Sequence, residues 1–297
     1  MIKKANKFIL LYHTAAKDDI AKQPKAAKMF CGGKMNLHFQ QKRERLQAIL
    51  PRDVHFDERT LTFLHRIDNI DLRNSASGRT ARVRTISDAN AEVHTGGPKM
   101  TNAEKLTLAK HACHIRMGVI EGTHSAKCGH PGGSLDIAEV LAYLYFVEMK
   151  VDPKDPKNPD RDRLVLSKGH AAPALYAALA ERGFFPVEDL KTLRKIGSYL
   201  QGHPNMNSVP GVDMSTGSLG QGVSAACGMA LGAKHAGKPI NVYTILGDGE
   251  VEEGECWEAF MFASHYGLSN LCVMLDRNHL QIDGTTETVM NSAPLEE

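Results

Sequence analysis

The sequence has little of what would place it in a specialised structural class. Its 297 residues include 6 cysteines and one tryptophan, and the cysteines form no C-x-x-C pair. This gives no support for a zinc site or a disulfide scaffold, and it is typical of reduced core cysteines in a cytoplasmic protein. Apolar runs near the roughly 20 residues that cross a bilayer are also missing, so we expect no membrane protein. The 42% of hydrophobic residues suffices for a buried core.

The formal net charge of +2 hides two segments of opposite sign. Residues 1–99 hold 19 basic and 10 acidic residues, whereas residues 100–297 hold 17 basic and 24 acidic residues. The first segment has little hydrophobic periodicity, and no nucleic-acid-binding motif accompanies its charge. We therefore interpret residues 1–99 as a basic, poorly ordered extension of unknown role, and expect no nucleic-acid partner.

The second segment opens with a helix-start signal just after Met100. Thr101 and Glu104 form a capping box ahead of an apolar-periodic stretch. Met100 is also a natural start of translation, so we treat 1–99 as an upstream extension. Helices are expected at about 103–121, 134–149, 171–182, 187–196, 219–236 and 253–266, and strands at 240–246 and 271–276. Apolar strands separated by helices predict an α/β fold, a parallel sheet flanked by helices.

Polar residues follow both predicted strands directly. The Asp248 carboxylate lies in a Gly-Asp-Gly turn after the first strand, and Asn278 follows the second strand 30 residues later. The glycines permit a tight turn close to a ligand, and the next helix start offers N–H groups to phosphate. One crossover helix would bring both side chains to the same sheet edge, where their oxygens suit Mg²⁺. Gly-Asp-Gly alone is an ordinary turn, but with this spacing it matches the thiamine diphosphate motif.

Further motifs carry a resemblance to a known family. Residues from about 103 to 291 resemble the diphosphate-binding domain of transketolase. The exact residues of the motifs resemble those of the N-terminal subunit of the two-chain prokaryotic enzymes. The motifs lie at 129–134 (GHPGGS), 167–171 (SKGHA), 201–204 (QGHP), 215–222 (STGSLGQG), 247–254 and 276–278 (DRN). The resemblance implies the thiamine-diphosphate-binding fold, incomplete at the C-terminus, because the family's domain continues with further strands. Residues 100–297 are thus expected to be a truncated domain with an unpaired strand edge.

The resemblance also implies ligands for thiamine diphosphate and Mg²⁺. The metal ligands would be Asp248, Asn278 and the backbone carbonyl of Leu280. The residues expected to contact the cofactor are His170, Gly217, Ser218, Leu219, Gly249 and Asn278.

Three residues are implied in catalysis. His130 and His203 match histidines that line the substrate channel, and Glu253 matches a carboxylate that positions the cofactor-activating glutamate across a dimer interface. Imidazoles suit this task because they hydrogen-bond sugar hydroxyls and exchange protons near neutral pH. A competing interpretation makes these histidines ordinary turn residues, Leu219 a core leucine and Glu253 part of a solvated helix face.

The implied reaction is that of transketolase (EC 2.2.1.1) in the pentose phosphate pathway. A two-carbon ketol unit passes from a ketose phosphate to an aldose phosphate. In the family, the activating glutamate and most sugar-phosphate ligands belong to a pyrimidine-binding domain that has no counterpart here. The resemblance therefore implies that the partner is a C-terminal transketolase subunit, in a dimer or hetero-oligomer, and that the chain is inactive without it.

Two alternatives stay open. One is another thiamine-diphosphate enzyme, such as deoxyxylulose-phosphate synthase or a 2-oxoacid dehydrogenase subunit, although the motifs at 129–134 and 167–171 argue against both. The other is a catalytically inert fragment that acts as a binding protein, in which case residues 1–99 would be the feature of interest.

Overall fold

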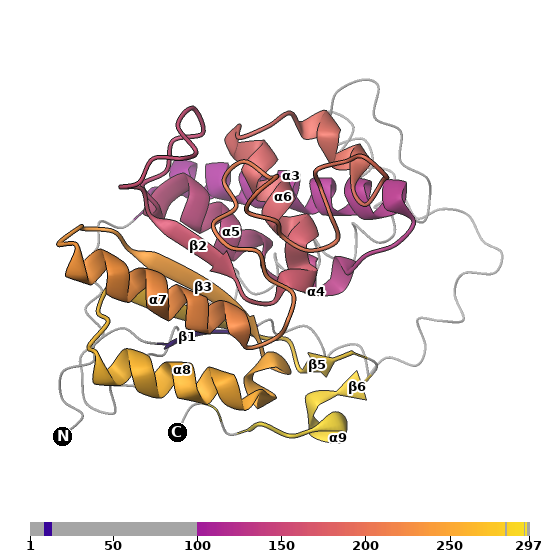
Figure 1. The fold of residues 1–297 in the computed structure, drawn as a ribbon. Helices are drawn as coiled ribbons and strands as arrows, with labels where there is room; N and C mark the ends of the chain where they lie inside the picture. Colours follow the sequence, from indigo (N-terminus) through magenta and orange to yellow (C-terminus); the bar gives the residue numbers. More distant parts are fainter. Residues whose placement is uncertain (1–8, 14–99, 283, 294, 296–297) are drawn as a thin grey trace. The chain divides into compact units, whose positions relative to one another are not determined.

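The computed structural model describes residues 9–13, 100–282, 284–293 and 295. Predictions for the rest of residues 1–99 lie outside this part of the chain. The described residues form a parallel sheet between two layers of helices, so the predicted fold class is confirmed (Figure 1). None of the helices among them is long and apolar enough to cross a membrane.

The main sheet has four parallel strands in the order β1-β4-β3-β2. Their bounds are Ile9–His13 (β1), Arg163–Leu166 (β2), Val242–Gly247 (β3) and Leu271–Arg277 (β4). The sequence predicts β3 and β4 but not β2, because four residues are too few to show a strand period. It also fails to predict β1, which pairs in parallel with β4. Parallel pairing joins backbones far apart in sequence, so side-chain patterns do not reveal it.

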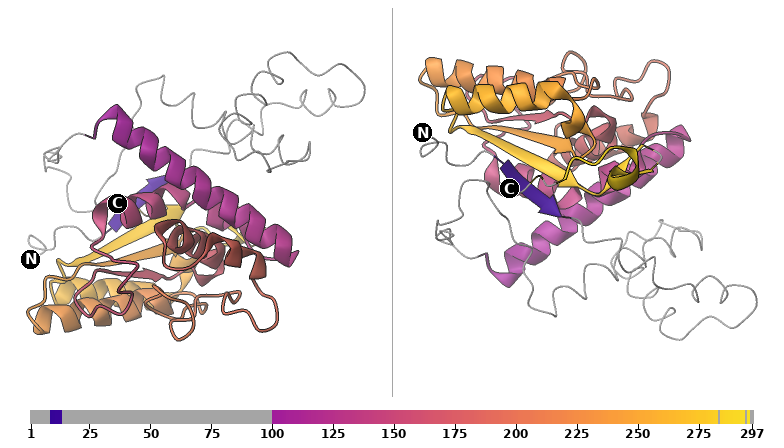
Figure 2. Two further views of the ribbon diagram at one scale, coloured as in Figure 1. Left: turned by 90° about the horizontal axis from the view of Figure 1, so that it is seen from above. Right: turned by 90° about the horizontal axis from the view of Figure 1, so that it is seen from below.

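Each face of the sheet has its own core. On one face, Tyr243, Ile245 and Met274 pack with helices α3 (Asn102–Ala126), α5 (Ala138–Tyr143) and α6 (Ala172–Arg182). On the other, Val273 and Leu275 pack with helices α7 (Gln221–His235) and α8 (Gly254–His265). Both views in Figure 2 show the sheet lying between α3 on one side and α7 with α8 on the other. This double burial accounts for the apolar strands without strict alternation.

Four of the six predicted helices form with shifted ends, as α3, α6, α7 and α8. The α3 capping box is formed, since the Glu104 N–H donates to Thr101 Oγ1 over 3.2 Å and the Thr101 N–H donates to the Glu104 carboxylate over 2.6 Å. The helix ends five residues later than predicted, at a left-handed Lys127.

Two predicted helices are corrected. The stretch expected at 134–149 is broken into three pieces, and the one at 187–196 is a short 3-10 turn. The shorter elements are α4 (Pro131–Leu135), the π-helix η2 (Leu144–Glu148), η3 (Gly169–Ala171), η4 (Val187–Thr192), η5 (Glu250–Glu252), β5 (Leu280–Gln281), β6 (Gly284–Thr285) and α9 (Thr286–Val289).

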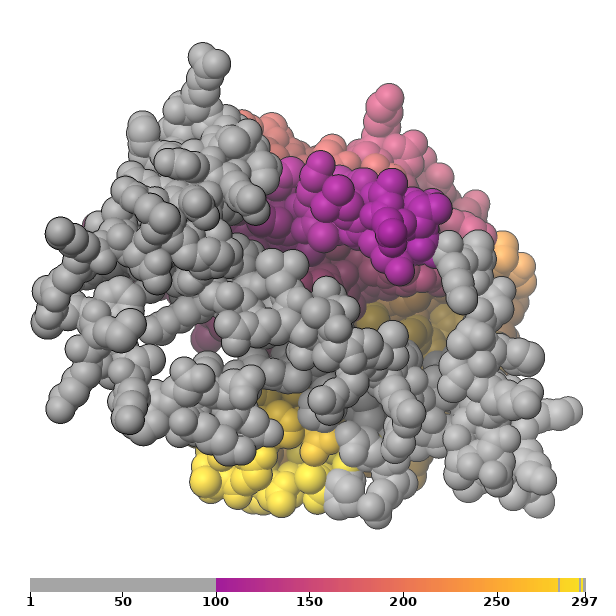
Figure 3. All heavy atoms as spheres, turned by 180° about the vertical axis from the view of Figure 1, so that it is seen from behind, coloured from indigo at the N-terminus to yellow at the C-terminus, as the bar shows by residue number. Residues whose placement is uncertain are grey.

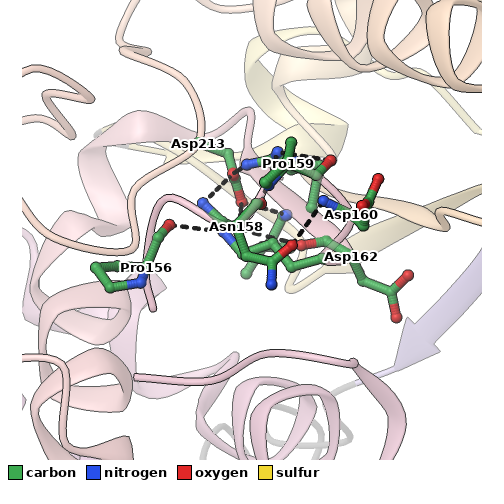
Figure 4. Close-up of polar contacts among 9 residues, drawn as sticks. Pro156, Asn158, Pro159, Asp160, Asp162 and Asp213 are labelled. Carbon is green, nitrogen blue, oxygen red and sulfur yellow. Dashed lines mark hydrogen bonds and ion pairs between the residues drawn. The ribbon is translucent and has the colours of Figure 1, made fainter. Parts of the chain in front are cut away.

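A buried ionic cluster fixes the amino end of β2 (Figure 4). The Asp213 carboxylate accepts hydrogen bonds from Arg161 and Arg163 and, over 2.8 Å, from the Leu164 N–H. Breaking one partner of such a buried pair costs about 3–5 kcal/mol. Since Asp213 lies just before the 215–222 motif, the cluster anchors the start of that loop to the sheet.

Candidate active site

The ends of β3 and β4 come together as the sequence predicts. Gly247 pairs with Asp276 in the register of the two strands. Just beyond, the Asp248 N–H donates to the Asp276 carbonyl over 3.1 Å, and the His279 N–H donates to Asp248 Oδ2 over 2.6 Å. The turn that carries Asp248 and the segment that carries Asn278 therefore share one edge of the sheet.

Acidic groups are concentrated and buried at this edge. Asp248 and Asp276 are 3% and 2% exposed. Burial raises the pKa of Asp248, and the Asp276 carboxylate raises it further, while the His279 N–H lowers it. The buried Lys168 ammonium neutralises Asp276 Oδ2 over 2.5 Å, and Asp276 Oδ1 has no hydrogen-bond partner in the described structure. More negative than positive groups are thus buried here, and a bound divalent cation would neutralise the excess negative charge.

Asn278 is oriented by a neighbouring carboxylate. Its Nδ2 donates to Asp136 Oδ2 over 2.9 Å, and its Oδ1 accepts from the Leu280 N–H over 2.9 Å. Burial, followed by repulsion from Asp276, raises the pKa of Asp136 to about 6. The Asn278 amide is therefore held with its nitrogen on the acidic side, and its oxygen retains a lone pair. Together with Asp248, this is a set of hard oxygen donors that fits Mg²⁺.

The three predicted histidines gather beside the acidic edge. The rings of His130 and His170 meet edge to face with centroids 5.4 Å apart. A Cβ atom on Gly217 would lie 3.1 Å from the His203 ring. Tyr176 holds His203 from behind, because its hydroxyl donates to the His203 carbonyl over 2.8 Å.

The imidazoles of His170 and His203 are kept neutral. Burial is the main cause that lowers the pKa of His170 to about 4, and the charges of Lys168, His130 and His203 contribute to this value. Burial also lowers the pKa of His203, with Arg194 and His130 adding to the effect. A neutral imidazole both donates and accepts a hydrogen bond, so these rings can hold or exchange hydroxyl protons at neutral pH.

Glycines let the loops approach one another around this site. A Cβ atom on Gly169 would lie 2.8 Å from the Gly217 backbone nitrogen, and one on Gly249 would lie 2.9 Å from Gln281 Cγ. Ser218 and Leu219 follow Gly217 in the same loop. Residues 215–220 therefore run past His203 and the turn that carries His170.

Glu253, the carboxylate implied in catalysis, differs from the buried site residues in its exposure. It precedes the first residue of α8, and its side chain is exposed. Leu280 lies two residues beyond Asn278, in β5. The Glu253 side chain is thus exposed, but its Cβ borders the site, because a Cβ atom on Gly220 would lie 3.1 Å from it.

Glu250 is a site residue that sequence reasoning missed. It is 2% exposed and accepts hydrogen bonds from Ser167 Oγ over 2.5 Å, the Gly220 N–H over 2.9 Å and the Gly247 N–H over 3.0 Å. Burial raises its pKa, whereas these donors lower it. The carboxylate therefore joins β3, the start of α7 and the loop after β2. Lys168 and Asp136 were missed as well. Lys168 and Glu250 lie within the 167–171 and 247–254 motifs, which is the one sequence signal that could have pointed to them.

This arrangement of fold and site is that of a diphosphate-binding α/β domain. The chain belongs to the transketolase family, because the family model for "Transketolase, thiamine diphosphate binding domain" matches residues 108–295. The resemblance seen in the motifs is therefore confirmed.

Curated relatives include subunits and full-length enzymes. The chain is 51% identical over 194 residues to the 6-deoxy-6-sulfo-D-fructose transketolase subunit SqwG of Clostridium sp. (strain MSTE9), covering 65% of this chain and 70% of that protein. It is 47% identical over 185 residues to an apulose-4-phosphate transketolase subunit of Phocaeicola vulgatus, covering 62% and 66%. It is 49% identical over 179 residues to the transketolase of Pongo abelii, of which it spans 29%.

Solved structures agree with this assignment. The chain matches the transketolase of Leishmania mexicana with a TM-score of 0.61 and 36% identity, covering 63% of this chain and 29% of that one. The transketolase of Campylobacter jejuni gives a TM-score of 0.60 and 34% identity, with coverage of 63% and 31%. The protein is thus a transketolase-type, thiamine diphosphate-binding subunit of a transferase.

Proposed function

We propose that this chain is the diphosphate-binding half of a two-chain transketolase that depends on thiamine diphosphate and Mg²⁺. The enzyme would move a two-carbon ketol unit from a ketose phosphate to an aldose phosphate, in the cytoplasm and in pentose phosphate metabolism. One observation supports this most strongly: the segments bearing Asp248 and Asn278 meet at a sheet edge beside the clustered histidines His130, His170 and His203.

In this proposal, the chain's own residues anchor and orient the reactants. Asp248, Asn278 and the Leu280 carbonyl hold Mg²⁺, and the Gly249 N–H and His170 contact the diphosphate. Gly217, Ser218 and Leu219 lie along the cofactor, which supplies a carbanion-forming ring and an electron sink when bound. His130 and His203 hold or exchange protons of the sugar hydroxyls.

The proposed partner is a C-terminal transketolase subunit that carries the pyrimidine-binding domain. Two observations support it. Relatives that match along most of their length are named as subunits. Helix α8, which begins directly after Glu253, also exposes the large apolar side chains of Trp257 at 50% and Met261 at 66%. We propose that this face of α8 packs against the partner, with Glu253 directed toward the partner's activating glutamate and the chain inactive alone.

The identity of the ketose is a separate question within the same reaction class. Two relatives are named for 6-deoxy-6-sulfo-D-fructose and for apulose 4-phosphate. The transferred two-carbon unit is common to all such ketoses, which differ in the carbon skeleton beyond it. We propose xylulose 5-phosphate as donor and ribose 5-phosphate as acceptor, and the other two ketoses are the alternatives to be compared.

The test is reconstitution of the full chain with a C-terminal transketolase subunit, Mg²⁺ and thiamine diphosphate. Ketol transfer from each of the three donors is measured with ribose 5-phosphate as acceptor. We expect activity with the pair and none with either chain alone. Cofactor binding without transfer for any donor would contradict the proposed reaction, and absence of both would favour an inert binding protein.

A further inference from the structure

A second group of metal-ligating side chains lies outside the active site. His111 and His114 on α3 and Glu181 on α6 each offer one ligand atom, and these three atoms lie within 4.8 Å of one another. Both imidazoles direct Nδ1 at the same carboxylate oxygen, Glu181 Oε1, over 2.9 Å and 2.8 Å. Two nitrogens and one oxygen from two different helices therefore converge on one point.

The local structure holds this geometry in place. The two histidines are three residues apart on α3, so they lie on the same face of the helix. The His111 ring stacks on Phe146 with centroids 3.7 Å apart and an angle of 13° between the planes. Glu181 is the residue before the last of α6, and its side chain is 19% exposed. Two of the three ligands are thus fixed by packing before any ion binds.

The His114 side chain makes the cluster accessible to solvent. The His114 side chain is 54% exposed, against 26% for His111. Figure 3 shows the outer face of α3 at the molecular surface. An ion bound between these groups would have three protein ligands and at least one position open to water, as in metal sites that exchange ligands.

The donor set indicates which ions fit. Two imidazoles and one carboxylate suit Zn²⁺ and neighbouring transition ions such as Co²⁺, Ni²⁺ and Cu²⁺, whereas Mg²⁺ prefers oxygen alone. Bonds of about 2.0–2.2 Å from the ion to each ligand atom would replace the present N–H···O contacts after small side-chain shifts. The carboxylate also neutralises part of the ion's charge.

We propose that His111, His114 and Glu181 form a binding site for a divalent transition-metal ion that bridges α3 and α6. The site lies far from the reaction centre along the same two helices. From His114 to the end of α3, which precedes His130, the axis runs about 18 Å at ~1.5 Å per residue. The ion would therefore brace the helix pair without entering the catalytic chemistry.

Without an ion, the same atoms form two hydrogen bonds to one carboxylate, and this arrangement is the competing explanation. The two explanations differ in what they predict for added metal. A simple hydrogen-bonded group gains nothing from Zn²⁺, whereas a metal site makes the folded chain more stable by an amount that grows with ion concentration.

The experiment uses the full chain with any affinity tag removed. Zn²⁺ is titrated by calorimetry in the presence of excess Mg²⁺, and Co²⁺ spectra and Cu²⁺ electron paramagnetic resonance report nitrogen ligands. The variants are His114→Ala and Glu181→Gln, each compared with His124→Ala, which removes an exposed histidine from the same helix. All variants are also made in an Asp248→Ala background, so that an ion bound at the active-site edge is not counted.

The expected result is one Zn²⁺ that is lost from the binding isotherm, or bound at least about tenfold more weakly, in His114→Ala and Glu181→Gln but not in His124→Ala. The melting temperature of the wild type should rise with Zn²⁺, and that of His114→Ala should not. Because His114 is half exposed, its replacement leaves the fold intact. Equal Zn²⁺ affinity in the wild type and His114→Ala, or Cu²⁺ spectra without nitrogen coupling, would overturn the proposal.

Discussion

The backbone N–H of His279 donates a 2.6 Å hydrogen bond to Oδ2 of Asp248, and this bond joins the loops after β4 and β3. It fixes the orientation of a carboxylate that is almost fully buried. It also brings Asn278, the preceding residue, to the same edge of the sheet. The proposed cofactor chemistry depends on this relationship and on the neighbouring groups that maintain it.

Asp136 is expected to act as a positioning residue for Asn278, because its carboxylate accepts the amide N–H of that side chain. Replacing Asp136 by Ala should free the Asn278 amide and weaken Mg²⁺-dependent cofactor binding by about tenfold. Asp136→Asn retains an acceptor oxygen and should restore most of the affinity. Calorimetry of thiamine diphosphate in the presence of Mg²⁺ measures both. Equal affinity of the Ala variant and the wild type would refute the assigned role.

His170 should titrate far below an ordinary histidine, because burial and the Lys168 charge lower its pKa to about 4. An unfolded histidine takes up its proton near pH ~6.5. Between these values the unfolded state binds more protons, so the free energy of unfolding should fall as the pH drops from about 6.5 towards 4. The imidazole signals in NMR report the midpoint. A His170 midpoint near the ordinary histidine value of about 6.5 would contradict the described packing.

Two glycine substitutions should have opposite effects on stability. A Cβ atom on Gly169 would meet the backbone of Thr216 and Gly217 at 2.8 Å, so Gly169→Ala forces a loop to move and should cost about 1–3 kcal/mol. Gly228 lies inside α7 with no atom within 4 Å of its virtual Cβ, so Gly228→Ala should add about 0.5–1 kcal/mol. Urea denaturation measures both variants. If Gly169→Ala were as stable as Gly228→Ala, the close contact between these loops would be disproved.

The elements that the sequence predicts well are those with local signals. The capping box of Thr101 and Glu104 marks the start of α3 correctly, whereas the helix end is set by a left-handed Lys127, which no sequence rule singles out. Strand β2 is too short to show a period. Strand β1 pairs with β4 across more than 250 residues of chain, so local patterns carry no trace of it.

The residues of the candidate site also divide into those that the sequence predicts and those that it does not. Asp248 and Asn278 are predictable because their spacing follows from two strands and one crossover helix. Lys168, Asp136 and Glu250 are not, because each acquires its role from partners that only the tertiary structure brings near. Glu250 is an example, since its three hydrogen-bond donors lie at Ser167, Gly220 and Gly247.

The central claim is that this sheet edge binds thiamine diphosphate through Mg²⁺, and one calorimetric comparison tests it most directly. Thiamine diphosphate is titrated into the reconstituted pair with and without Mg²⁺, using the wild type, Asp248→Asn and the control Asp155→Asn, which alters an exposed carboxylate. We predict Mg²⁺-dependent binding in the wild type and in Asp155→Asn. Binding by Asp248→Asn should be at least about a hundredfold weaker, because loss of a metal ligand weakens binding more than loss of a residue that only orients a ligand. Equal binding by all three chains, or binding that is indifferent to Mg²⁺, would contradict the account.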